Sequence, residues 1–170
     1  MTAPEFSRPV DRRNLTEKPV TLAASEDECL ALAERFGLVA ITRLDASVVL
    51  VADGDIVTGE GSFSADVVQS CAISGDDLAV TIAEPLHLRF VPDVPVEAEE
   101  IDLEPEELDE IPYHGTVFDL GEAVAQSLAL AIDPYLTGPD ADRVRAEKGL
   151  SDEAASGPFA ALAALKGSKT

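Results

Sequence analysis

The stretch Val48-Val49-Leu50-Val51-Ala52-Asp53-Gly54-Asp55-Ile56-Val57 decides the fold of this chain. Its first four residues are aliphatic and mostly β-branched, which favours a strand. Asp53-Gly54 suits a two-residue hairpin turn, because both central positions of that turn need a positive φ. Apolar residues resume at Ile56, so the stretch predicts two antiparallel strands joined by a tight turn.

More strand signals follow on the C-terminal side of this hairpin. The second strand, 56–68, contains Gly59 and Gly61, which indicate a bulge or a close approach of another backbone. A turn at 74–77 precedes a third strand, in which apolar and polar residues alternate over 86–90. Three successive strands without crossover helices predict an antiparallel sheet, which could be barrel-like, and not a doubly wound one.

Two capped helices flank the predicted sheet. Ser25-Glu26-Asp27-Glu28 has the Ser-x-x-Glu form of a capping box and opens a helix near 26–36, which Gly37 ends. Asp119-Leu120-Gly121-Glu122 offers a similar cap to a helix near 119–132, and Asp133-Pro134 stops it. Both helices carry an apolar stripe. We therefore predict an α+β fold, an antiparallel β-sheet packed against two main helices.

The length of 170 residues favours one domain of ordinary size. We place a single α+β domain at residues 1–136, with an acidic loop at 97–112 inside it. Residues 137–170 are interrupted by Gly and Pro and are expected to form a C-terminal tail. Pro158 suits the first turn of a helix, so this tail is predicted to hold a short helix at 158–166.

The charge of the chain excludes several classes of protein. Twelve Lys and Arg residues against 33 Asp and Glu residues give a formal net charge of −21. Such a surface disfavours tracking of nucleic-acid phosphates and adsorption to anionic membranes. No stretch approaches the ~20 apolar residues of a membrane span, and no secretion signal opens the chain. We expect a soluble cytoplasmic protein.

Residues 97–110 concentrate this negative charge, with nine acids in fourteen positions and no base. Such density is self-repelling and predicts a solvated, mobile loop. Charge complementarity suits it to a basic protein partner. The residues that we expect to bind this partner are Glu99, Glu100, Glu106, Glu107, Asp109 and Glu110.

No catalytic set is evident in the sequence. Glycine-rich phosphate loops and a nucleophile elbow are absent, and the acidic run lacks the ligand spacing of a calcium loop. His87 and His114 are unclustered and are expected at the surface, and Cys29 is expected in the core. We predict no enzymatic activity, no cofactor and no metal.

An alternative from another class is a small-ligand-binding module or a small enzyme with a pocket between the sheet and the second helix. Its candidate residues are Cys71, His87 and Asp119. This alternative requires the three side chains to converge in a cleft. For Asp119, the role of a helix N-cap is a sufficient explanation.

Four marks stand in order along the chain: Ser7-Arg8-Pro9-Val10, Gln69-Ser70-Cys71, the run from Asp119 to Leu130 followed by Asp133-Pro134-Tyr135, and the apolar run from Pro158 to Lys166. Together, over residues 6–166, they resemble the bacterial YceD family in its alphaproteobacterial form. The resemblance implies a role in accumulation of large-subunit (23S) ribosomal RNA, meaning its synthesis, processing or stability. It implies no enzymatic activity and no cofactor.

The chain departs from this family at one informative place. Many members carry Cys-x-x-Cys where this chain has Cys71-Ala72-Ile73-Ser74. Because Ser74 replaces the second thiol and no other Cys is near in sequence, a four-thiolate zinc site cannot be assembled. We predict that Cys71 binds no zinc and is dispensable for folding.

The resemblance and the charge together favour an indirect action on RNA. We expect a basic ribosomal or RNA-processing protein as partner and no membrane. Direct RNA contact is the less favoured route, because it requires a local basic patch. Such a patch could come only from the mildly basic ends, which contain Arg8, Arg12, Arg13, Lys18, Arg143, Arg145 and Lys148.

Overall fold

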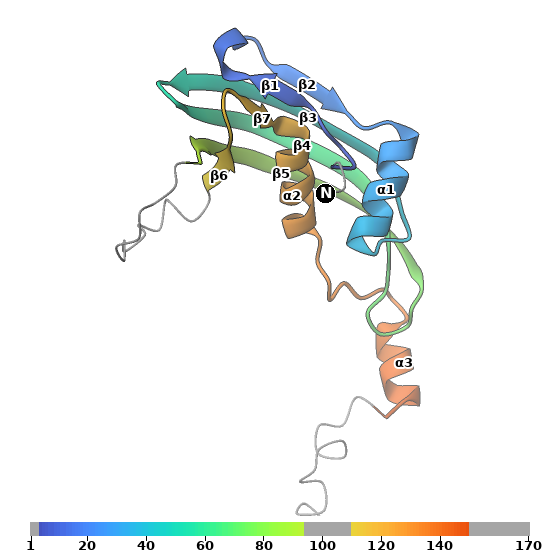
Figure 1. Ribbon diagram of the computed structural model, residues 1–170. Helices are drawn as coiled ribbons and strands as arrows, with labels where there is room; N and C mark the ends of the chain where they lie inside the picture. The colour runs from blue at the N-terminus through green and yellow to red at the C-terminus, as the bar shows by residue number, and fades with distance from the viewer. Residues whose placement is uncertain (1–3, 94–109, 150–170) are drawn as a thin grey trace, which may run out of the picture. The chain divides into compact units, whose positions relative to one another are not determined.

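The computed structural model describes residues 4–93 and 110–149 (Figure 1). Its strands are β1 (Pro9–Asp11), β2 (Val20–Ala23), β3 (Ala40–Asp53), β4 (Ile56–Ser70), β5 (Asp77–Pro92), β6 (Glu110–Tyr113) and β7 (Val117–Asp119). Its helices are α1 (Glu26–Phe36), α2 (Leu120–Ala131) and α3 (Ala141–Glu147), with a 3-10 turn at Arg12–Asn14. This mixture of elements confirms the predicted α+β class.

Five strands form the main sheet, in the order β2-β3-β4-β5-β6. β3 pairs antiparallel with both β2 and β4. β6 pairs parallel with β5, with Arg89 opposite Glu110 and Pro92 opposite Tyr113. The sheet is therefore mostly antiparallel, as predicted, and it is open, with β2 and β6 at its edges. β1 and β7 form a separate antiparallel pair.

The predicted acidic loop, 97–112, is wrong at its C-terminal end, because residues 110–112 belong to β6. Long-range packing explains the difference. Ile111 packs against the core, and the Arg89 Nε donates to the Glu110 carboxylate at 2.8 Å. The ion pair with Arg89 and the packing of Ile111 thus stabilise a strand here despite the repulsion between neighbouring acids. Residues 97–109 of the predicted loop lie outside the described residues.

The predicted hairpin between β3 and β4 is present, but its two turn residues are Gly54 and Asp55, one position later than the predicted Asp53-Gly54. Asp53 pairs with Ile56, and Gly54 takes a positive φ of 62° in the turn between them. The pairing continues without a break from this turn to Arg43 opposite Asp66 and then shifts at an irregularity between Ile41 and Arg43.

The predicted close backbone approach is present at Gly61. A β-carbon at this position would overlap the carbonyl oxygen of Ser47, which belongs to the neighbouring strand β3. Glycine is required here because β3 and β4 leave no room for a side chain.

Helix α1 begins with the predicted capping box. The Glu28 N–H donates to the Ser25 hydroxyl, and the Ser25 N–H donates to the Glu28 carboxylate. Gly37 ends the helix in a left-handed conformation with φ 66°. Cys29 and Leu32 are buried on the inner face, as their spacing predicts.

Helix α2 also begins at its predicted cap. The Asp119 carboxylate accepts a hydrogen bond from the Glu122 N–H at 3.1 Å. Leu120, Val124 and Leu128 are fully buried along one face. Removing each of these side chains from water stabilises the fold by roughly 1.5–3 kcal/mol.

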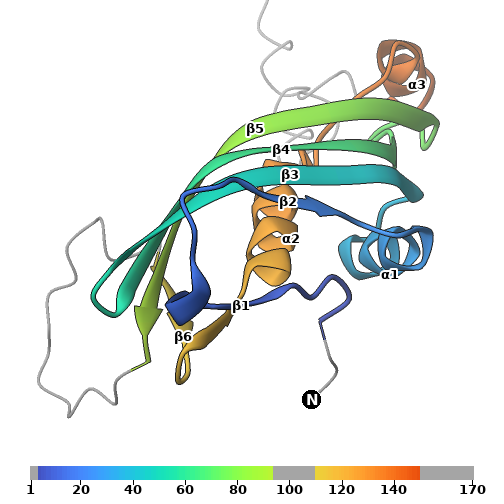
Figure 2. The same ribbon diagram turned by 90° about the horizontal axis from the view of Figure 1, so that it is seen from above.

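Both α1 and α2 lie on the same side of the curved sheet, and β1 lies on that side too (Figures 1 and 2). The core forms between these helices and the sheet. Its largest fully buried side chains include Phe6, Leu32, Leu44, Leu86, Phe90, Leu120 and Leu128. Phe90 of β5 stacks on Phe118 of β7 with ring centroids 4.2 Å apart, which ties the smaller sheet to the larger one.

Residues 70–78 and 133–149 form a second unit, separate from the unit that contains the sheet and α2. Within the second unit the Ala72 N–H donates to the Leu136 carbonyl at 2.9 Å, which joins its two chain segments. Within the predicted C-terminal tail, residues 141–147 are helical as α3. The predicted helix at 158–166 lies outside the described residues, and the domain division after residue 136 stays a prediction.

Candidate functional site

The structure locates one of the six acids predicted to bind a partner. Glu110 is the first residue of β6, and Arg89 of β5 pairs with its carboxylate at 2.8 Å. The other five, Glu99, Glu100, Glu106, Glu107 and Asp109, lie outside the described residues.

The three candidates of the alternative ligand-binding site each have partners of their own. His87 of β5 lies 2.6 Å from the Glu60 carboxylate of β4. Asp119 binds main-chain and hydroxyl groups at the start of α2. Cys71 belongs to the second unit, where it contacts a turn. Among the residues that the structure describes, no hydrogen bond or ion pair joins any two of these three side chains.

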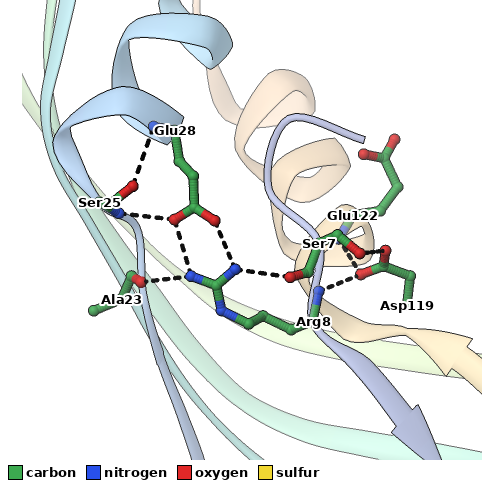
Figure 3. Close-up of polar contacts among 7 residues, drawn as sticks. All are labelled: Ser7, Arg8, Ala23, Ser25, Glu28, Asp119 and Glu122. Atoms are coloured by element: carbon green, nitrogen blue, oxygen red, sulfur yellow. Dashed lines mark hydrogen bonds and ion pairs between the residues drawn. The ribbon is translucent and has the colours of Figure 1, made fainter. Parts of the chain in front are cut away.

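Asp119 does more than cap α2, as Figure 3 shows. Its Oδ1 accepts from the Arg8 N–H at 2.8 Å as well as from the Glu122 N–H. Its Oδ2 accepts from the Ser7 hydroxyl at 2.5 Å. One carboxylate therefore holds the N-terminal segment against the first turn of α2.

Arg8 links this N-terminal segment to α1 (Figure 3). Its guanidinium forms two parallel hydrogen bonds to the Glu28 carboxylate, at 2.7 and 2.9 Å, and also donates to the carbonyls of Ser7 and Ala23. This pairing lowers the pKa of Glu28 to about 2 and raises the pKa of Arg8. Bidentate geometry of this kind is the strongest form of the arginine–carboxylate pair.

The sequence gives no local sign of this network. Arg8 is 20 residues from Glu28 and its main chain is 111 residues from Asp119. Ser7-Arg8 and Asp119 are two of the marks that carry the family resemblance, and the structure brings them together. The network joins the N-terminal segment to the first turns of both α1 and α2.

Cys71 lies in a turn that supplies hydrogen bonds to its sulfur. The Sγ accepts from the N–H groups of Ser74 at 3.4 Å and Gly138 at 3.3 Å. The Ser74 side chain is the largest cause, followed by these N–H groups, of a pKa of Cys71 lowered to about 6. The residue is 4% exposed, so the structure favours the structural interpretation of this thiol over an exposed one. Within residues 4–93 and 110–149, no three His, Cys, Asp or Glu side chains gather as metal ligands would.

A groove runs along α2, between this helix and the edge formed by β5 and β6. Three adjoining hollows of about 370, 270 and 320 Å³ make it up, and neighbouring hollows share lining residues. We call it the α2 groove. It is bounded by Ala123, Gln126, Ser127 and Leu130 of α2 and by His87 and Ile111 of the sheet edge.

The α2 groove combines an exposed apolar side chain with several carboxylates. Leu130 is 89% exposed beside it, which makes it the most exposed large hydrophobic residue among those described. Four carboxylates, those of Glu84, Glu110, Asp119 and Glu122, line it, and no Lys or Arg does. Glu122 is paired with Arg35 of α1 at 2.8 Å and Glu110 with Arg89, whereas Glu84 has no ion-pair partner in the described part of the chain.

A larger hollow of about 750 Å³ crosses four strands of the sheet. Leu22, Ala46 and Phe63 are buried on the core face of the sheet. Side chains alternate between the two faces of a strand, so their neighbours Ser47 and Ser62 lie on the opposite face, where they line the hollow. This side is lined mostly by small side chains. Its lining includes two carboxylates, those of Asp45 and Glu84, and Arg43 pairs with Asp45 at 2.6 Å.

No helix in the described part of the chain is long and apolar enough to cross a membrane. No curated protein and no solved structure matches the chain. A family model does match, over residues 59–166, and its description is large ribosomal RNA subunit accumulation protein YceD. The matched residues run from within β4 through α2 and α3 and leave out Ser7 and Arg8, which the structure joins to Asp119. Because the match spans more than half of its length, the chain belongs to the YceD family of large ribosomal RNA subunit accumulation proteins.

Proposed function

We propose that this protein supports the accumulation of 23S ribosomal RNA without catalysing a reaction, by holding a basic ribosomal or RNA-processing protein against its acidic run, residues 97–110. Membership of the YceD family supports the role in accumulation of ribosomal RNA. The negative charge of the chain supports a basic protein as its partner. Through such a partner the protein would act on the synthesis, processing or stability of the RNA.

The density of the acids supports a protein partner. Residues 91–142 contain fifteen acids and no Lys or Arg, and nine of those acids fall within 97–110. At physiological ionic strength the screening length is about 8 Å, so only clustered charges act together. A cluster of this kind raises the rate of association with a basic protein and rejects acidic partners.

The arginines of the N-terminal segment are a poor surface for RNA, since carboxylates already bind them. Arg8 pairs with Glu28, Arg12 with Asp55 at 2.7 Å, and Arg13 with Asp11 at 2.6 Å. RNA contact through these guanidinium groups would have to compete with those pairs. The ammonium groups of Lys18 and Lys148 have no ion-pair partner among the described residues, and they are the better probes of RNA contact.

Affinity capture of the tagged full-length protein from cell extract tests the proposal. The wild type is compared with a variant that carries Glu99→Gln, Glu100→Gln, Glu106→Gln and Glu107→Gln, at low and at high salt, and both protein and RNA are identified. We expect the wild type to retain a basic protein at low salt and the variant to lose it. A matched control, Lys18→Gln with Lys148→Gln, should capture the same protein as the wild type. Purified protein that binds large-subunit RNA tightly, and loses it in the lysine variant, would contradict the proposal.

A further inference from the structure

We infer that the α2 groove binds an extended peptide segment of the partner, one that carries both basic and large apolar side chains. The inference rests on the proposed function, and it adds where the partner binds and what chemistry the bound segment has. Binding to the acidic run alone would depend on the positive charge of the partner. Binding in the groove would also require large apolar side chains in the partner.

The shape of the groove comes from small side chains on α2. Ala123, Ser127 and Ala131 are four residues apart, so they lie one above another on the helix and leave space beside the sheet edge. The groove lining extends from Asp119, the N-cap of α2, to Ala131 at the end of the helix, which is about 18 Å at the rise of an α-helix. An extended chain covers that distance in about five residues.

The main chain of the sheet favours an extended occupant. β6 pairs with β5 only from Arg89 to Pro92, although β5 begins at Asp77. In the described part of the chain, Leu86–Leu88 therefore have no strand beside them on the groove side of the sheet. An unpaired strand edge offers main-chain hydrogen bonds to a peptide, while the adjoining hollows accept its side chains.

The side chains of the groove favour a peptide that is both apolar and basic. Leu130, with 89% of its surface exposed, offers apolar contact at one end. Glu84 is exposed at the same end and has no ion-pair partner among the described residues. At the other end the groove reaches Glu110, the residue at which the acidic run ends. A Lys or Arg of the bound segment would pair most readily with Glu84, since Glu110 and Glu122 already have arginine partners.

Two synthetic peptides of equal length and charge test the inference on the full-length protein. In one, lysine alternates with leucine, and in the other, serine replaces every leucine. Fluorescence anisotropy of labelled peptide should show tighter binding of the leucine peptide. Leu130→Ser should weaken that binding by about five- to tenfold, because part of a leucine surface is no longer buried. Leu30→Ser, on α1 at a residue that is 71% exposed and outside the groove lining, should leave it unchanged.

A second variant and a second measurement complete this test. Ser127→Phe fills the groove with a large side chain and should weaken binding of the leucine peptide as Leu130→Ser does. Equal binding of the two peptides, or unchanged affinity in both groove variants, would overturn the inference. Sedimentation that shows a dimer dissociated by Leu130→Ser would also overturn it, since a second copy would then occupy the groove. If only the four Glu→Gln changes in the acidic run weaken the peptides, the groove inference fails while the proposed function stands.

Discussion

The carbonyl oxygen of Phe6 lies 2.5 Å from the position that a β-carbon on Gly121 would occupy. The Arg8 nitrogen lies 2.9 Å from the same position. The N-terminal segment thus contacts α2 main chain to main chain, and Asp119, two residues before Gly121, holds the contact with its carboxylate. This junction brings together two marks that are far apart in the sequence.

Gly121→Ala should destabilise the protein, although the same change in an ordinary helix is stabilising by about 0.5–1 kcal/mol. The added methyl group must displace main chain, which costs on the order of 1–3 kcal/mol. Urea unfolding measures the difference. Gln126→Ala, at an exposed position of the same helix, is the control and should change stability little. An alanine at residue 121 that raises stability would show that the contact with Phe6 is not as close as described.

Asp119→Ala should cost about 2–3 kcal/mol, because it removes a helix cap and two further hydrogen bonds. Asp119→Asn keeps one acceptor oxygen, so its cost should be smaller. Urea unfolding of the two variants gives the comparison. Equal stability of Asp119→Ala and the wild type would mean that the carboxylate has a role other than holding this junction.

The Arg8–Glu28 pair should contribute to stability in a defined pH range. Because the folded pKa of Glu28 is lowered from 4.5 to about 2, its contribution is fully present above the unfolded value. The contribution should then be lost as the pH falls between these two values. Glu28→Gln keeps an amide oxygen for the capping box and removes the ion pair. We expect the difference in unfolding free energy between the wild type and Glu28→Gln to shrink over this range.

Glu26→Gln is the matched control for this pH dependence. Glu26 is exposed in the same first turn of α1, and its carboxylate has no ion-pair partner in the described chain. The difference between the wild type and Glu26→Gln should change much less over the same pH range. Parallel behaviour of the two variants would assign the effect to the helix end and not to Arg8.

The pKa values of the two cysteine thiols should be shifted in opposite directions. Hydrogen bonds to its sulfur lower the pKa of Cys71 to about 6, whereas burial, followed by the charge of Glu28, raises the pKa of Cys29. The ultraviolet absorbance of the thiolate, measured against pH, should show a transition near 6 that disappears in Cys71→Ser. Persistence of that transition in Cys71→Ser, or its absence from the wild type, would contradict the turn geometry. The measurement does not require a reagent to reach the buried sulfur.

The features that the sequence predicts are those decided by neighbouring residues. The hairpin turn and the two helix caps depend on residues at most four positions apart, and all three are present, with the turn one residue later than predicted. The approach at Gly61 is predicted for the same reason, because a glycine inside a strand indicates crowding.

The features that the sequence does not predict depend on partners far along the chain. β6 forms because Glu110 meets Arg89 and Ile111 meets the core. The role of Arg8 requires Glu28 and Asp119 to be in place. The α2 groove likewise cannot be predicted from neighbouring residues. The spacing of its small residues indicates one face of a helix, but it does not indicate which strands lie opposite that face. Leu130, which sequence reasoning leaves aside, becomes a candidate contact only through its exposure.

The proposed action of the acidic run on ribosomal RNA through a partner can be tested in cells. Cells that lack the protein are supplied with the wild type, with the variant carrying Glu99→Gln, Glu100→Gln, Glu106→Gln and Glu107→Gln, or with Lys18→Gln and Lys148→Gln. The amount of large-subunit ribosomal RNA relative to small-subunit RNA is then measured at matched protein levels. We expect the wild type and the lysine variant to restore this ratio and the glutamine variant to leave it as low as in cells without the protein. Full restoration by the glutamine variant would show that the acidic run is not needed, and failure of the lysine variant would indicate direct RNA contact.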